Sequence, residues 1–203
     1  MAAVDFFFFH GSTYTYLTVM RIENVAKAAG VEVRWRPFNV RVIMNEQKNI
    51  PFAEKPVKRA YMWRDVQRRA RRHRLEWNGH PPYPIDPDLL VNRIGLLAAE
   101  EGWGPQYSKA AYRRWAVDHV AIGPVETVEP ILTALGQDTA RVIAAANSKA
   151  IRDRFDAETD EARRLGIFGS PTFAVDKEIF WGDDRLEEAL EWAKSSTLEG
   201  SRT

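Results

Sequence analysis

The sequence predicts an α/β protein in which a small sheet is built from the two ends of the chain and a long helical segment is inserted between them. Three observations lead to this prediction. Apolar strand patterns lie only within residues 1–38 and after residue 166. Residues 56–165 are rich in Ala, Arg, Glu and Leu and hold few β-branched runs, as expected of helices. At 203 residues and 45% hydrophobic content, the chain is long enough for one domain with a large insertion.

The first 38 residues are expected to form a β-α-β unit. Phe6–Phe9 is apolar without alternation, which is typical of a central strand covered on both faces. A helix is expected to begin at about Thr13 and to end at Gly30. Its apolar residues recur at spacings of three or four and form one stripe: Tyr16, Val19, Ile22, Ala26 and Ala29. Residues 31–36 then alternate apolar and charged side chains, which predicts a half-buried strand parallel to the first.

The inserted segment is expected to contain a series of helices. Their predicted ranges are 56–74, 87–102, 105–119, 124–135, 138–146 and 148–165. Glycine and proline clusters separate them, notably at residues 79–84 and 102–105. Asp86 or Asp88 is expected to cap the second of these helices and Asp138 a later one, because a carboxylate accepts hydrogen bonds from the free amides of a first turn.

Strand patterns return near the end of the chain. Thr172–Val175 and Ile179–Trp181 flank residues 176–178, a segment short enough for a hairpin turn. A final helix with one apolar face follows, with Asp183 or Asp184 as its cap. The full order, β-α-β, a helical block and then α-β-β-α, is that of a thioredoxin-like domain with a large all-helical insertion.

We assign residues 1–40 plus 160–203 to the thioredoxin-like domain and residues 41–159 to the helical insertion. The 29 Lys and Arg residues balance 28 Asp and Glu, which gives no global argument for binding nucleic acid or an acidic membrane. We interpret the basic run at residues 68–74 as a solvated helix face rather than a nucleic-acid site. The sequence has no long apolar stretch and no signal-peptide pattern, so we expect a cytoplasmic protein that does not enter a membrane.

The chain contains no cysteine. This excludes disulfides, thiolate metal sites and an intrinsic redox pair, so any thiol chemistry must use a thiol from outside. The four histidines have no metal-ligand spacing, and no metal is expected; they are His10, His73, His80 and His119.

Ser12 stands where the first strand turns into the first helix. Most serines in this place are simple N-caps, and that interpretation stays open. The main-chain amides at a helix start also carry positive partial charge and stabilise an anion. Thiols placed there can fall in pKa from about 8.5 to between about 3.5 and 7.5. We therefore interpret Ser12 as a residue that holds the sulfur of an external thiol.

Other candidate residues have an ordinary structural interpretation beside a functional one. Pro171 precedes a strand, where proline is usually an entry residue. One of Asp183 and Asp184 is expected to cap a helix, and the second carboxylate suggests capture of an ammonium group. His10 is either a packed polar residue or a functional residue beside Ser12.

A further group of candidates depends on how far a ligand extends. Asn49 and Lys58 are ordinary surface residues unless a ligand carboxylate reaches them. Most aromatic side chains are expected in the core, but a few are candidates for lining a flat apolar pocket. We place Tyr14 and Trp63 in this pocket, together with His10.

With these residues in view, the chain resembles the 2-hydroxychromene-2-carboxylate isomerases, relatives of the kappa-class glutathione transferases in the group that includes bacterial dithiol oxidases. The resemblance spans nearly the whole chain. Its strongest parts are residues 4–17, 166–173 and 180–186, with a looser match over residues 58–65. The sequence departs from the common pattern at Thr13, where proline usually follows the serine, and at His10-Gly11, where an aromatic or bulkier residue is frequent.

The resemblance implies a role for each matched residue. Ser12 would hydrogen-bond the sulfur of bound glutathione, and Ser170, before a cis Pro171, would pair with the cysteinyl backbone. Asp183 and Asp184 would hold the γ-glutamyl end. At the glycyl end the counterparts are Asn49 and Lys58. The resemblance also implies a homodimer.

Our leading hypothesis is a glutathione-dependent isomerase of 2-hydroxychromene-2-carboxylate or a related aromatic compound, with no nucleic-acid or membrane partner. Addition of a thiolate to a conjugated carbon removes double-bond character, so that ring opening, rotation about a single bond and loss of the thiol can follow. A second hypothesis is a glutathione transferase or peroxidase that uses the same site. A third is a non-catalytic thioredoxin-fold binding module, which the absence of cysteine permits.

Overall fold

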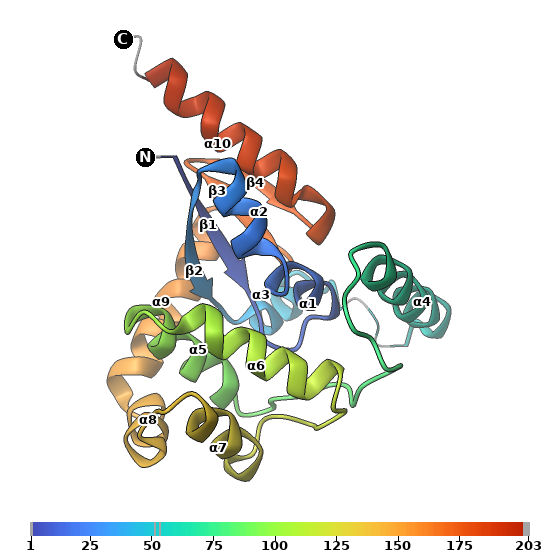
Figure 1. Ribbon diagram of the computed structural model, residues 1–203, viewed down its shortest axis with the longest axis vertical. Helices are drawn as coiled ribbons and strands as arrows, with labels where there is room; N and C mark the ends of the chain where they lie inside the picture. Colours follow the sequence, from blue (N-terminus) through green and yellow to red (C-terminus); the bar gives the residue numbers. More distant parts are fainter. Residues whose placement is uncertain (1, 51, 53, 201–203) are drawn as a thin grey trace.

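A four-stranded mixed sheet forms the centre of the thioredoxin-like half (Figure 1). The computed structural model of the protein describes residues 2–50, 52 and 54–200. The strands are β1 (Ala3–Phe8), β2 (Glu32–Pro37), β3 (Thr172–Val175) and β4 (Glu178–Trp181), in the order β2-β1-β3-β4. β1 pairs parallel with β2 and antiparallel with β3, and β3 pairs antiparallel with β4. The predicted parallel pair and the predicted hairpin are both confirmed.

The central strand β1 is covered on both faces, as its unbroken apolar run predicts. Successive side chains of a strand point to opposite faces. Phe6 and Phe8 belong to the larger core. Phe7 and Phe9 belong to a second, smaller core on the other face, which includes Phe38. The first helix packs into the larger core through Tyr16, Leu17 and Val19.

The helices between and beyond the strands account for most of the chain. They are α1 (Thr13–Val19), α2 (Ile22–Ala29), α3 (Val40–Glu46), α4 (Pro56–Arg72), α5 (Leu90–Glu100), α6 (Gly104–Ala116), α7 (Val125–Ala134), α8 (Thr139–Ala146), α9 (Lys149–Arg164), the 3-10 helix η1 (Asp183–Arg185) and α10 (Leu186–Gly200). The helices expected between residues 56 and 165 are confirmed as α4 to α9. The predicted cap at Asp138 is confirmed, since its carboxylate accepts a hydrogen bond from Arg141 N at 3.0 Å. Asp86 accepts from Val91 N and Asn92 N in the first turn of α5, although Leu89 occupies the N-cap position. The cap expected from Asp183 or Asp184 is wrong, because η1 begins after Gly182 without a side-chain capping hydrogen bond.

The structure corrects two predictions about the helices. The single helix expected between Thr13 and Gly30 is wrong, because the chain breaks between α1 and α2. Arg21 leaves the helical region with φ −130°, and its buried side chain donates to Asp183 O and Glu187. A tertiary contact therefore breaks a helix that the local apolar stripe favours. The short helix α3 was not expected at all.

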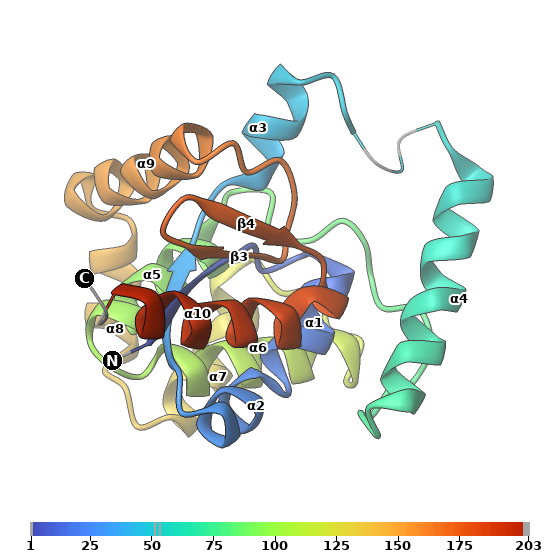
Figure 2. The same ribbon diagram turned by 90° about the horizontal axis from the view of Figure 1, so that it is seen from above.

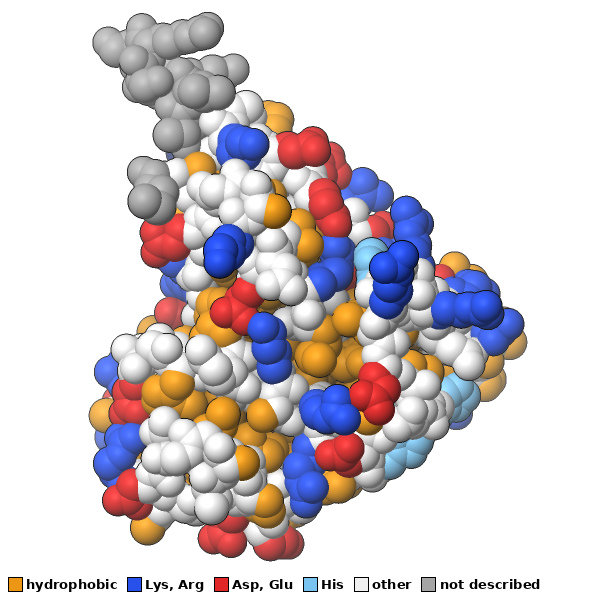
Figure 3. Space-filling view, viewed as in Figure 1, with side chains coloured by type: hydrophobic (Ala, Val, Ile, Leu, Met, Phe, Trp, Pro, Cys, Tyr) orange, Lys and Arg blue, Asp and Glu red, His pale blue; other side chains and the backbone are white. Residues whose placement is uncertain are grey.

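The helical insertion divides into two parts. α5 to α8 gather at one end of the sheet, and α4 stands at the side of the molecule (Figures 1 and 2). α4 packs through its buried residues, Met62, Trp63, Val66 and Ala70. Its other side carries many of the basic residues, and Figure 3 shows Lys and Arg side chains over this helix. The division at residues 40/41 and 159/160 stays a prediction, and its ends at residues 1 and 201–203 lie outside the described residues.

Candidate functional site

Ser12 lies at the junction between β1 and α1 and caps the helix. Its Oγ accepts a hydrogen bond from Thr15 N at 3.4 Å and donates one to Ser170 O at 2.8 Å. The N-cap interpretation is therefore confirmed. A hydroxyl carries a single proton, so donation to a ligand sulfur requires Ser12 to turn away from the Ser170 carbonyl.

The Ser170–Pro171 turn meets this junction from the other end of the chain. The peptide bond between these two residues is cis. Ser170 Oγ lies 2.9 Å from Phe9 N, which donates to it, and 2.9 Å from Thr15 Oγ1. The structure thus brings Ser12, Ser170 and Pro171 together from opposite ends of the sequence, as the resemblance implies. Where β1 ends, the Thr15 and Ser170 hydroxyls contact each other, and the Ser12 hydroxyl contacts the Ser170 carbonyl.

The helix that starts here is short. α1 has seven residues, and its first turn holds no acidic residue. The stabilisation that such a helix offers an anion comes mostly from the amides of its first turn, because the macrodipole acts within a single turn. The positive environment at Ser12 is therefore a local one.

The helical insertion holds the loop that carries Ser12, residues 9–12, which we call the entry loop. Asn92 Oδ1 accepts from His10 N at 2.7 Å, and Asn92 Nδ2 donates to His10 O at 3.1 Å. Tyr112 OH lies 2.8 Å from Phe9 O and 3.2 Å from Ser12 O. These contacts fix the backbone of the entry loop. The one sequence signal for this role is the polar Asn92, which lies with Arg93 in an otherwise apolar run over residues 89–97.

A buried carboxylate supports Asn92. Asp86 is fully buried, and its Oδ2 accepts from Asn92 Nδ2 at 2.7 Å. Burial raises the pKa of Asp86, although the hydrogen bonds from Asn92 and from the amide of Val91 oppose the rise. The carboxylate is held within the insertion and does not reach Ser12.

The His10 side chain is packed against side chains of β1 and of the insertion. The residue is 1% exposed, and its ring lies against those of Phe8, Tyr107 and Tyr112. Its Nε2 lies 3.1 Å from Ser108 Oγ, and burial lowers the pKa of His10 to about 3. The imidazole is therefore neutral at physiological pH. A role for His10 in a substrate pocket stays a prediction.

Tyr14 and Trp63, the other predicted pocket residues, lie where α1 and α4 meet. Tyr14 OH donates to Asp65 Oδ2 at 3.1 Å, and burial together with Asp65 raises the pKa of Tyr14. Trp63 is 8% exposed and stacks on His80 with ring centroids 4.9 Å apart, with Tyr83 at its edge. Tyr83 is 39% exposed, and His80 is exposed as well.

Asp183 and Asp184 lie close to the Ser170–Pro171 turn, because Gly182 N donates to Pro171 O at 3.0 Å. Their environments differ. Asp183 is 1% exposed, and its Oδ2 accepts from Arg69 Nε at 3.0 Å and lies 2.9 Å from Arg69 Nη2. Burial raises the pKa of Asp183 to about 6 against the opposing effect of Arg69. The Asp184 side chain is 47% exposed, with Arg185 Nη2 at 3.6 Å.

Asn49 and Lys58 lie farther out, on the segment between α3 and α4 and on the first turn of α4. Both are exposed. Within the described residues, no recorded hydrogen bond or ion pair joins either side chain to Ser12 or Ser170. Their contribution to the site stays a prediction.

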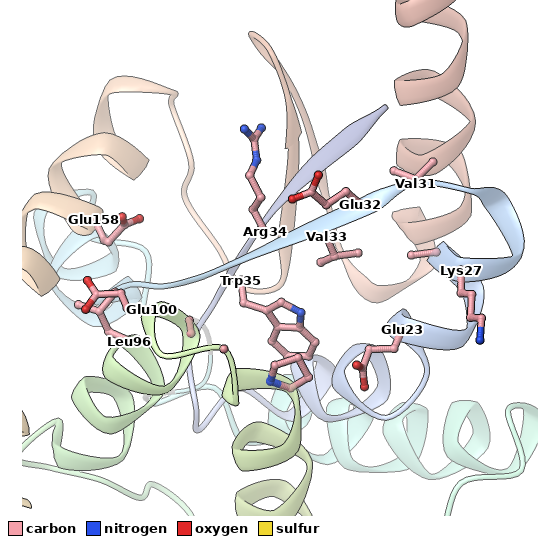
Figure 4. Close-up of a pocket in the computed structure, with 14 residues that line it drawn as sticks. Glu23, Lys27, Val31, Glu32, Val33, Arg34, Trp35, Leu96, Glu100 and Glu158 are labelled. Atoms are coloured by element: carbon pink, nitrogen blue, oxygen red, sulfur yellow. The ribbon is translucent and has the colours of Figure 1, made fainter. Parts of the chain in front are cut away.

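The structure contains a groove far from this constellation. It has a volume of about 670 Å³ and runs along β2 between α2 and α5 (Figure 4). None of the residues predicted for the site lines it. Among the described residues, no group of three His, Asp or Glu side chains is placed to hold a metal ion, and no helix is long and apolar enough to cross a membrane.

Comparisons with known proteins agree with this architecture. The sequence pattern of the DSBA-like thioredoxin domain matches residues 3–191. A 2-hydroxychromene-2-carboxylate isomerase of Sphingobium xenophagum is 25% identical over 189 residues, which cover 91% of this chain and 94% of that protein. One from Pseudomonas putida is 26% identical over 190 residues and covers 90% of each chain. A solved structure of a 2-hydroxychromene-2-carboxylate isomerase superposes with a TM-score of 0.81 at 24% identity and covers 98% of each chain.

Proposed function

Because this chain belongs to the DSBA-like thioredoxin domain family, we propose that it is a glutathione-dependent isomerase of 2-hydroxychromene-2-carboxylate or a related aromatic compound. The two curated isomerases match over about nine-tenths of their length, which supports the reaction class. One observation carries the proposal: Ser12 Oγ and Ser170 O meet at 2.8 Å beside Pro171, in a chain that has no cysteine.

The residues present fit a thiol that is supplied from outside. Thiol–disulfide exchange requires a thiolate on the protein, and this chain has none. Where β1 ends it instead carries three hydroxyls and the free amides of α1. Hydroxyl and amide donors stabilise a sulfur anion without reacting with it. When bound, glutathione supplies a thiolate that adds reversibly to a conjugated carbon and so permits rotation about a former double bond.

The chain's own residues would hold and orient the two reactants. Ser12, by turning from Ser170 O, donates a hydrogen bond to the sulfur, and the first amides of α1 add to the stabilisation. Ser170, next to Pro171, pairs with the cysteinyl backbone. The γ-glutamyl end lies near Asp183 and Asp184.

The remaining roles in the proposal lie around this centre. Asn49 and Lys58 face the carboxylate of the glycyl end. The aromatic substrate lies against Tyr14 and Trp63, with His10 supporting the entry loop from behind. Burying an aromatic substrate beside the sulfur excludes water and strengthens each of these polar contacts.

The experiment is an isomerisation assay on the purified chain with and without glutathione. We expect conversion of the chromene carboxylate only when glutathione is present. Conversion that does not depend on glutathione, or no conversion under any condition, would contradict the proposal.

The alternative functions are separated by parallel assays. A transferase or peroxidase would act on chlorodinitrobenzene or on hydroperoxides faster than on the chromene. A non-catalytic module would turn over none of these substrates, and calorimetry would record no heat when glutathione is added up to millimolar concentration. Neither pattern is expected from the proposed isomerase.

The proposal includes a cytoplasmic location and a homodimer. A chain without cysteine is compatible with a reducing compartment, which also maintains reduced glutathione. Sedimentation of the purified chain tests the homodimer, and a monomer at all concentrations would contradict it.

A further inference from the structure

The charge of the chain is balanced in total but is unevenly distributed. Residues 55–74, which form α4 and its flanks, hold nine of the 29 Lys and Arg residues and one of the 28 Asp and Glu residues. This segment therefore carries a formal charge of +8, and the rest of the chain carries −7. The balanced total, which favours a merely solvated helix face, hides a strongly basic surface.

The outer side of α4 is open. The helix packs through one side, and Figures 1 and 2 show no described element over the other. Arg64, Gln67 and Arg71 recur on α4 at spacings of three and four residues, so they lie in one row, and all three are exposed. Arg64 Nη1 donates to Gln67 Oε1 at 2.6 Å, which confirms that neighbours in the row touch.

The row ends in a hollow at the C-terminal end of α4. The hollow has a volume of about 530 Å³, and it is lined by Gln67, Arg71, Arg74, Leu75, Glu76 and Trp77. Trp77 is half-buried, and its ring packs at a tilt against the rings of Tyr16 and Trp63. Two guanidinium groups therefore lie beside an aromatic ring. We call Arg64, Gln67, Arg71 and Arg74 the arginine row.

The carboxylate at the hollow does not neutralise the row. Glu76 Oε2 accepts from Arg113 Nη1 at 2.9 Å, so its charge is already matched by a cation of α6. Within the part of the chain that the structure describes, the Arg71 and Arg74 side chains make no ion pair and no hydrogen bond. Both guanidinium groups are therefore available to a ligand.

The outer side of α4 is also self-repulsive. Arg68 lies four residues after Arg64 and four residues before Arg72, and like charges at this spacing destabilise a helix. Only Arg68 among these three has an acidic partner, Asp65 Oδ1 at 3.0 Å. A ligand with several negative charges would relieve this repulsion, whereas a surface without a ligand has no need of it.

Guanidinium groups in a row beside an aromatic ring match one ligand chemistry. The planar guanidinium binds a phosphate through two parallel hydrogen bonds. Single-stranded nucleic acids are bound by cations that follow the backbone and by aromatic side chains on which bases stack. We propose that the arginine row binds the phosphates of a single-stranded nucleic acid and that one base enters the hollow and stacks against Trp77.

An anionic membrane fits this surface less well. A helix that lies in a membrane interface inserts an apolar side between the lipids. The apolar side of α4 is already buried against the protein through Met62, Val66 and Ala70. The segment that follows Tyr61 along the outer side offers arginines and no exposed apolar side chain in α4.

Binding of a fluorescein-labelled oligothymidylate of about 12 nucleotides, followed by fluorescence anisotropy, tests the proposal. We expect binding at low salt, and log affinity falling against log salt concentration with a slope of about −2, since three arginines each release counterions. Polyglutamate of similar charge and phosphatidylserine vesicles are expected to compete poorly. No binding at low salt, or equal competition by either polyanion, would overturn the proposal.

An oligonucleotide that lacks its bases tests the hollow on the wild-type protein. This ligand keeps the phosphates and loses the stacking on Trp77, and we expect it to bind about tenfold more weakly than oligothymidylate. Equal affinity of the two ligands would overturn the placement of a base in the hollow.

Variants locate the phosphate contacts. Arg71→Gln combined with Arg74→Gln is expected to weaken oligothymidylate about tenfold at low salt and to make the salt slope shallower by about 1.4. Arg152→Gln combined with Arg164→Gln is the matched control, because it removes the same charge from exposed positions of α9. Equal losses in the two double variants would show attraction to the net charge alone and would overturn the role of the arginine row.

The proposed nucleic-acid surface is independent of the thiol site. None of the residues predicted for the thiol site lines the hollow. We expect Arg71→Gln combined with Arg74→Gln to isomerise at the wild-type rate, which also shows that the variant is folded. A wild-type chain that isomerises its substrate and binds no oligothymidylate would overturn this inference and leave the proposed function intact.

Discussion

The entry loop is held from two sides, and the two sides satisfy its polar groups differently. On the insertion side, Asn92 and Tyr112 bind the backbone of the loop, and both are at most 1% exposed. On the sheet side, the contacts are made by the hydroxyls of Ser12, Thr15 and Ser170. The contacts of Asn92 and Tyr112 are buried and have no alternative partner, whereas the Ser12 hydroxyl is only partly buried and can rotate to a new one. The insertion therefore fixes the loop, and on the sheet side Ser12 keeps a hydroxyl that can turn toward a ligand.

The largest effect is expected when a contact on the sheet side of the entry loop is removed. Ser12→Ala removes the proposed donor to the sulfur and is expected to lower the isomerisation rate between about tenfold and a thousandfold. Loss of the N-cap is expected to cost only about 1 kcal/mol in the free energy of unfolding. Steady-state kinetics and denaturant unfolding measure the two quantities separately. A fully active Ser12→Ala variant would contradict the role of this hydroxyl.

The next largest effect is expected when the contacts on the insertion side of the entry loop are removed. Asn92→Leu leaves His10 N and O without their partner and removes the side-chain hydrogen bond to Asp86, and we expect a loss of about 3 kcal/mol in unfolding free energy. Asn147→Ala is the control, since the Asn147 amide accepts a hydrogen bond from Arg93 of α5 but is exposed. If the two variants unfold alike, the insertion does not clamp the loop as described.

A smaller effect is expected in the pH dependence of the unfolding free energy. The pKa of Asp183 is about 6 in the folded chain against an ordinary value of 3.8. Between these values the folded chain holds a proton that the unfolded chain has lost, so the unfolding free energy falls as pH rises through this window. We expect Asp183 to contribute on the order of 1 to 3 kcal/mol to that fall. Denaturant unfolding between pH 4 and pH 7 measures this fall. We expect the unfolding free energy of Asp183→Asn to depend less on pH than that of the wild-type chain. The same dependence on pH in both proteins would contradict the assigned role of Asp183.

Sequence patterns predict the elements that local periodicity controls. The apolar run before His10, the hairpin at residues 172–181 and α4 to α9 all follow from spacing and breaks. The interruption at Arg21 does not, because a partner more than 160 residues away causes it. Local patterns therefore fail where a distant side chain decides the backbone.

In the candidate site, too, local patterns predict some residues, and contacts between distant segments decide the others. Ser12 was predictable from its place before a helix, and the Ser170–Pro171 turn from the resemblance. The Arg69–Asp183 pair joins a basic segment to an acidic segment 114 residues away. Neither segment carries a sequence pattern that identifies the other as its partner. The burial of His10 depends on helices of the insertion that the sequence does not position in space.

The central claim is that an external thiol docks and ionises at the start of α1. Titration of the glutathione thiol on the protein tests it most directly, and the chain adds no thiol of its own to the signal. We predict that thiolate absorbance of bound glutathione appears with a pKa clearly below the ordinary value of about 8.5 and returns toward it in Ser12→Ala. A bound thiol that titrates like free glutathione in both proteins would contradict the account.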